Sequence, residues 1–116
     1  MDKILFDFTY LDDLSEDDKE FKADMINVFL ESAPASIREM QTFYKNKNWN
    51  SLREVAHKYK PQLGFMGIYS IMHDVEQIEQ ISTTKTNLDK LPELIENVEK
   101  VSKIASEQIK KEMKID

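Results

Sequence analysis

The chain has 116 residues, room for one domain over residues 1–116, with 16 basic and 22 acidic side chains and a net charge of −6. The absence of cysteine excludes disulfides and thiolate zinc sites, and two glycines and three prolines are too few for a β-sandwich or a glycine-rich phosphate loop. The acidic balance argues against nucleic-acid binding, which needs a basic surface.

Apolar residues recur at helical spacing from the first segments onward. A short helix is expected around Phe8–Asp13, and Ser15 with the acidic residues after it predicts the cap of a second helix over roughly 17–32. Pro34 predicts the first turn of a new short helix that ends near Asn46. The apolar stripe expected for the helix before Pro34 consists of Phe21, Met25, Val28 and Phe29.

Three further helices are expected in the second half of the chain. Asn48 caps a long helix that stops at Gly67. A polar loop over Ser82–Asn87 follows the next helix, whose apolar stripe is Ile68, Ile71, Met72, Val75, Ile78 and Ile81. The longest helix runs from Leu88 to about Met113, with an inward face of Leu91, Leu94, Ile95, Val98, Val101, Ala105 and Ile109.

No segment shows the alternating pattern of a strand, so the sequence predicts an all-α fold. Short connections favour an antiparallel up-down four-helix bundle formed by the last four helices, with one or two additional N-terminal helices packed against it. No apolar run reaches the ~20 residues needed to cross a bilayer, and the amino terminus has no signal-peptide pattern. We therefore expect a cytoplasmic protein without membrane contact.

The helix after Asn48 contains a histidine on its polar side. The residues about 120° to 180° from His57 on a helical wheel are apolar, namely Leu52, Val55, Tyr59, Leu63 and Met66. The residues within about 60° of His57 are Arg53, Lys60, Pro61 and Gly64. The imidazole is therefore expected to point toward water, with a lysine one turn along the same face.

The side chains on this face could take part in phosphoryl chemistry. A neutral imidazole nitrogen can attack phosphorus, and the ammonium of Lys60 can offset the charge of a phosphoryl group. Gly64 has no side chain, which leaves room for a partner protein to approach His57. Residues 45–60 contain five basic side chains and one acidic side chain, a net of +4, which suits docking to an acidic cleft.

The pattern His57-x-x-Lys60, followed by Gly64 and Gly67, resembles the signature of the histidine-containing phosphotransfer (HPt) domains of bacterial phosphorelays. The flanking layout is similar as well. The resemblance implies that His57 is the phosphoacceptor and Lys60 stabilises the phosphoryl group. It also implies that Gly67 is structural and that the partner-docking residues are Arg53, Lys58, Pro61 and Gly64.

The resemblance further implies a phosphorelay intermediate. It would accept a phosphoryl group from the phospho-aspartate of a receiver domain onto His57 and pass it to another response regulator, with a hybrid sensor histidine kinase upstream. The chain would bind no cofactor, because the Mg²⁺ belongs to the partner receiver domain, and without a nucleotide-binding segment it would not be an ATP-dependent kinase. We expect a monomer. Met1 and complete end helices favour a free-standing carrier over a fragment of a hybrid kinase.

Pro61 departs from the family pattern, in which many members have glycine after the lysine. Proline removes the amide that would bond the carbonyl of His57, so a local kink and an altered choice of partners are expected. Two alternatives stay open at this point. One is an interaction module with an HPt fold and no phosphoryl chemistry, against which the His57–Lys60 pair argues. The other is a metal-dependent bundle enzyme, but the inward stripes lack carboxylates, and His73 is expected to be a surface residue rather than a metal partner of His57.

Overall fold

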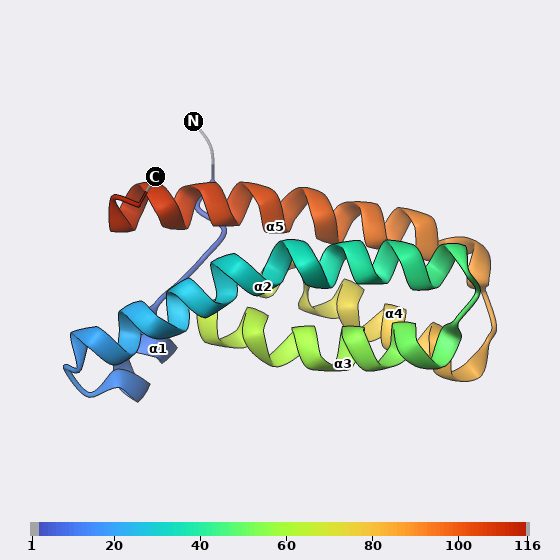
Figure 1. The fold of residues 1–116 in the computed structure, drawn as a ribbon, viewed down its shortest axis with the longest axis horizontal. Helices are drawn as coiled ribbons and strands as arrows, with labels where there is room; N and C mark the ends of the chain where they lie inside the picture. The colour runs from blue at the N-terminus through green and yellow to red at the C-terminus, as the bar shows by residue number, and fades with distance from the viewer. Residues whose placement is uncertain (1–2, 116) are drawn as a thin grey trace.

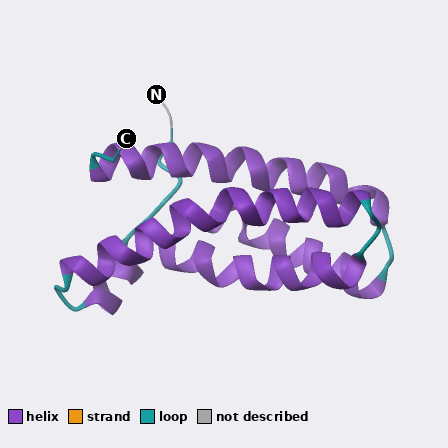
Figure 2. Cartoon of the chain, in the orientation of Figure 1, coloured by secondary structure: helices purple, strands orange, loops and turns teal. Residues whose placement is uncertain are grey.

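The structure, a computed structural model, describes residues 3–115 and within them contains helices and connecting turns but no strand (Figure 2). Met1, on which the expectation of a free-standing carrier depends, lies outside these residues. The helices are α1 (Thr9–Ser15), α2 (Lys19–Lys45), α3 (Trp49–Met66), α4 (Met72–Thr84) and α5 (Leu91–Met113), with short 3-10 turns at Tyr69–Ile71 and Leu88–Lys90. The predicted all-α class is confirmed.

Helices α2 to α5 form an antiparallel up-down bundle around a shared apolar core, in which α2 packs against both α3 and α5, and α4 packs between α3 and α5 (Figure 1). Helix α1 lies beside the first turns of α2 and contacts α3. The bundle with an additional N-terminal helix is therefore present as predicted. No helix within residues 3–115 has the combination of length and hydropathy that a bilayer span requires.

The predicted helix boundary at Pro34 is wrong. Helix α2 continues without interruption through Pro34, which is exposed. Proline cannot donate to the carbonyl of Leu30, but its ring lies on the outside of the helix. The opposite side buries one continuous stripe, and this burial offsets the lost hydrogen bond. The buried residues of that stripe are Ile26, Phe29, Ala33, Ile37 and Met40.

The start of α2 also differs from the prediction. Ser15 ends α1 and its hydroxyl donates to the carbonyl of Leu11 at 2.6 Å, so it does not cap α2. The cap is Asp18, whose carboxylate accepts the backbone N–H of Phe21 at 3.0 Å. Two residues with positive φ, Glu16 and Asp17, make the turn between the two helices.

The expected stripe of α2 was partly misplaced. Val28 is 60% exposed and Phe21 is 39% exposed, while Ile26, which the prediction left out, is fully buried. The boundaries near α4 and α5 also shift. Helix α4 extends to Thr84, and Leu88–Lys90 forms a 3-10 turn before α5 begins.

Both ends of α3 are defined by local hydrogen bonds. The Asn48 side chain accepts the backbone N–H of Ser51 at 3.3 Å, which confirms the predicted cap. At the other end Gly67 adopts φ 67°, its N–H donates to Gly64 O at 3.2 Å, and the N–H of Ile68 donates to Leu63 O at 2.9 Å. This is a Schellman motif, in which a left-handed residue closes the helix.

A buried polar contact ties α3 to α5. Tyr59 is fully buried, stacks on Phe29, and its hydroxyl lies 2.7 Å from the hydroxyl of Ser102. Burial raises the pKa of Tyr59 to about 12, from an ordinary value of 10.0. Of the wheel residues predicted to face the core, Val55 is only half-buried, and the others are buried.

The raised pKa of Tyr59 predicts a loss of stability at alkaline pH. Above pH 10 the unfolded tyrosine ionises while the folded one stays neutral, so the free energy of unfolding falls as the pH rises toward 12. In urea unfolding at pH 9 and 11.5, the wild type should lose about 2 kcal/mol more than Tyr59→Phe between the two values. Equal losses in both proteins would contradict the assignment.

Candidate functional site

His57 lies in the middle of α3 on the side turned away from the core. Its side chain is 70% exposed, while its helix neighbours Ala56 and Tyr59 are buried. The exposed imidazole expected from the helical wheel is therefore present. A partner molecule can reach this ring without any rearrangement of the bundle.

One nitrogen of the ring is held by α4. His57 Nδ1 lies 2.8 Å from Oε2 of Glu79, whose side chain is 27% exposed. An ionised carboxylate only accepts hydrogen bonds, so Nδ1 carries the hydrogen in this contact. In the neutral ring the lone pair is then on Nε2. Within residues 3–115 no hydrogen bond engages Nε2, so this nitrogen is available to an incoming group.

A second contact of the same kind lies one turn along. Lys60 Nζ is 2.8 Å from Oε1 of Glu76, with side-chain exposures of 38% and 48%. The hydrogen bond from Lys60 and the charge of its ammonium hold the pKa of Glu76 below its usual range. Glu76 therefore stays ionised at neutral pH, and its carboxylate holds Lys60 in position on the face that His57 occupies.

The two contacts follow from the antiparallel packing of α3 and α4. The two helices run in opposite directions, so residues further along α3 lie beside residues nearer the start of α4. Two residues three apart on one helix can therefore contact two residues three apart on the other. His57 and Lys60 thereby meet Glu79 and Glu76. Sequence reasoning missed both glutamates as site residues. The signal was present, because two acids repeat the spacing of the histidine and the lysine.

Pro61 and Gly64 follow His57 within an unbroken helix. Helix α3 runs to Met66 with Pro61 inside it, and Pro61 is exposed. The expected kink at Pro61 stays a prediction. A Cβ on Gly64 would meet only Met72 Cε, at 3.9 Å, which is an ordinary contact. The fold itself therefore has no steric need for glycine at position 64.

Gly67 is required by the fold. A Cβ at this position would lie 2.0 Å from Asp7 O, because the N-terminal segment crosses the end of α3 and Asp7 N–H donates to Met66 O at 3.1 Å. The positive φ of Gly67 adds a second reason, since left-handed backbone is unfavourable for residues with a side chain.

The remaining predicted docking residues are not all on one face. Arg53 is half-buried within the polar side of α3, and Lys58 is exposed. Lys58 lines a shallow hollow of about 250 Å³ between α2 and α3, together with Ser36 and Glu39. Lys58 therefore lies on the side of α3 that faces α2 and does not flank the imidazole.

An exposed apolar surface adjoins the C-terminal end of α3. Tyr10 of α1 stacks on Phe65 with ring centroids 5.9 Å apart, and Tyr10 is 48% exposed. The hydroxyl of Ser32 donates to the side chain of Gln62 at 2.9 Å, which sets the register of α2 against α3. Val28, one turn earlier on α2, then lies level with the end of α3. We call Tyr10, Val28 and Phe65 the apolar end surface.

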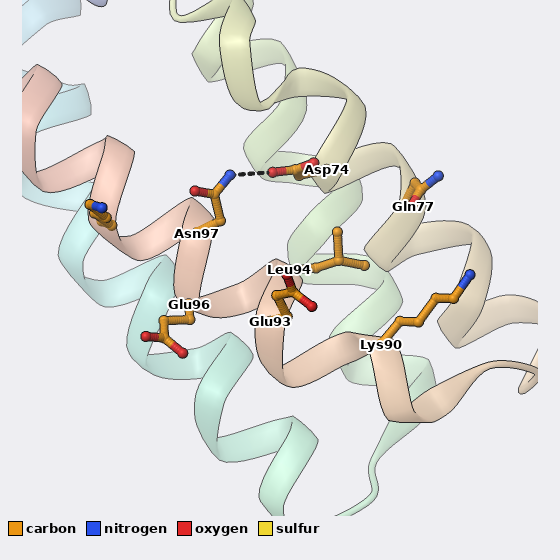
Figure 3. A pocket seen from close by; sticks show the side chains of 8 residues that line it. Asp74, Gln77, Lys90, Glu93, Leu94, Glu96 and Asn97 are labelled. Carbon is orange, nitrogen blue, oxygen red and sulfur yellow. Dashed lines mark hydrogen bonds between the residues drawn. The ribbon is translucent and has the colours of Figure 1, made fainter.

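A hollow lined by charged residues lies on another part of the bundle. A groove of about 580 Å³ runs between α4 and α5, and Asn97 donates across it to Asp74 at 2.6 Å (Figure 3). His57 is not among its lining residues. His73 is exposed and contacts Gln77, and within residues 3–115 no cluster of three or more His, Cys, Asp or Glu side chains could hold a metal ion.

Comparisons with known proteins bear on the family and the fold. A family model described as the Hpt domain matches residues 24–113. Among solved structures, the fold is similar to the crystal structure of histidine-containing phosphotransfer protein B (HptB) from Pseudomonas aeruginosa PAO1, with a TM-score of 0.83, 21% identity and 93% of each chain covered. At this identity the structural likeness shows the fold alone. No curated protein matches the sequence significantly.

The two glycines after His57 predict opposite effects on stability. Gly67→Ala should lower the free energy of unfolding by about 2–4 kcal/mol, because the new methyl group meets the Asp7 backbone and φ is positive. Gly64→Ala, the matched control, should raise it by about 0.5–1 kcal/mol, the usual gain of alanine over glycine in a helix. Urea unfolding of both variants checks the pair, and a tolerated Gly67→Ala would contradict the first expectation.

Proposed function

The chain belongs to the Hpt domain family of phosphotransfer carriers, and we propose that His57 carries the phosphoryl group between receiver domains of a phosphorelay. The observation that carries the proposal is the exposed His57 ring, whose Nδ1 contacts Glu79 while no described residue engages Nε2. A ring held through one nitrogen presents the other one in a fixed direction, which is what an in-line attack on phosphorus requires.

The bond-making part of the transfer step uses only this nitrogen of the chain. The Nε2 lone pair attacks the phosphorus of the receiver's aspartyl phosphate, the N–P bond forms, and the P–O bond breaks with its electron pair leaving on the aspartate carboxylate. The Nδ1 proton stays in place, and Glu79 stabilises the positive charge that the ring acquires. In the reverse direction the same steps return the phosphoryl group to an aspartate of a second receiver.

Lys60 supplies charge stabilisation. Its ammonium lies on the face of His57, one turn along α3, where it can approach the phosphoryl oxygens. Transfer of this kind depends mainly on position and charge. We expect the Mg²⁺ and the carboxylates that hold it to belong to the receiver, and we expect this chain to use no ATP.

Docking would involve the surface around the imidazole. Arg53, Pro61 and Gly64 supply basic and small residues there, Lys58 extends this surface toward α2, and the apolar end surface extends it beyond the end of α3. The local excess of positive charge suits the acidic cleft of a receiver. We propose that the chain acts as a monomer in the cytoplasm, with response-regulator receivers and a hybrid sensor histidine kinase as its partners.

His57→Gln should abolish phosphorylation. The measurement is acid-labile label on the chain after mixing with a receiver domain that acetyl phosphate and Mg²⁺ have phosphorylated. His73→Gln is the matched control, since His73 is also exposed but lies outside the site, and this variant should be labelled like the wild type. Label that persists in His57→Gln would place the phosphoryl group on another residue, whereas absence of label on the wild type would make the chain an interaction module with an HPt fold.

Glu79→Ala should slow phosphorylation of His57 by roughly fivefold, the value of one charge-assisted hydrogen bond of about 1 kcal/mol. Phosphoramidate serves as the donor, because a small molecule does not depend on the docking surface. Glu79→Gln keeps an oxygen that can accept from Nδ1 but loses the negative charge, so its rate should lie between those of Glu79→Ala and the wild type. If both variants react like the wild type, Glu79 has no role in orienting the ring.

A further inference from the structure

Lys60 has two possible anionic partners. In the structure its ammonium contacts the carboxylate of Glu76 at 2.8 Å, and Glu76 takes no part in the transfer step described above. After transfer, a doubly charged phosphoryl group on His57 Nε2 would lie one turn away on the same face. One ammonium cannot contact both anions at its full strength, so the carboxylate and the phosphoryl group compete for it.

Glu76 also acts on the phosphorylated state directly. Where Lys60 turns toward the phosphoryl group, Glu76 loses its ion pair and lies as an uncompensated negative charge near another anion. Glu79 stays bonded to Nδ1, so it does not replace the lost partner. Both effects raise the free energy of phosphorylated His57, and neither affects the unphosphorylated protein, in which the pair is intact.

From this contact we propose that Glu76 is a positioning residue that holds Lys60 in the resting protein and limits how far phosphoryl transfer to His57 proceeds. The inference rests on the proposed function. It assigns the chain a bias toward passing the phosphoryl group on rather than storing it. Because the ion pair is exposed, the expected effect on the transfer equilibrium is roughly two- to fivefold.

The test compares Glu76→Gln with Asp74→Asn. Both variants remove one negative charge from α4, but Asp74 faces α5 and bonds Asn97 (Figure 3). Each protein is mixed with a receiver domain phosphorylated by acetyl phosphate and freed of excess donor, and the share of phosphoryl group on His57 is measured at equilibrium. Glu76→Gln should raise the histidine-to-aspartate ratio roughly two- to fivefold, and Asp74→Asn should leave it unchanged. Added salt should shrink the difference.

A double-mutant cycle separates competition from a general charge effect. In a Lys60→Ala background, Glu76→Gln should lose the part of its effect that comes from sharing the ammonium and keep only the weaker, solvent-screened repulsion between the carboxylate and the phosphoryl group. An unchanged ratio in Glu76→Gln, an equal rise in Asp74→Asn, or a full effect without Lys60 would each overturn the inference while leaving His57 as the phosphoacceptor. Absence of label on His57 in the wild type would instead overturn the proposed function, and the inference with it.

Discussion

The packing of α4 against α3 is the constraint on which the site depends. Each helix buries an apolar stripe in the shared core, and this burial fixes how the two helices are rotated and offset. The rotation and offset of the helices then determine which polar residues beside the stripes lie next to each other. Glu79 faces His57 and Glu76 faces Lys60 because the core places them there, and the ion pairs themselves, being exposed, contribute little to stability.

Helix α3 contains features that stabilise a helix together with residues that disfavour one. A proline and a glycine lie on its outer side after His57, and both are unfavourable in a helix. The helix persists because its inner side is buried and both its ends are closed, by the Asn48 cap and by the Schellman turn at Gly67. Unfavourable residues are therefore placed where a partner would approach, which is where a departure from local preference is expected to serve function.

The fold could be predicted from the sequence where apolar periodicity and local preference agree, as in α3, α4 and α5. The prediction failed where a local sequence rule competed with burial of the apolar stripe. Pro34 is typical of a first turn, yet α2 continues because the stripe from Ile26 to Met40 is buried as one unit. Ser15 and Asp18 are both residue types that cap helices well. Which of them caps α2 depends on where α1 ends, and no short sequence motif predicts that end.

For the site, the sequence by itself determined the exposed histidine, the lysine one turn along the same face and the small residue after them, because all three lie on one helix with a fixed period. Only the tertiary structure decided which groups contact them. Glu76 and Glu79 belong to another helix, and their approach depends on the rotation and offset that core packing sets. The closeness of Asp7 to Gly67 has the same origin, since residues distant in sequence meet only when the core has formed.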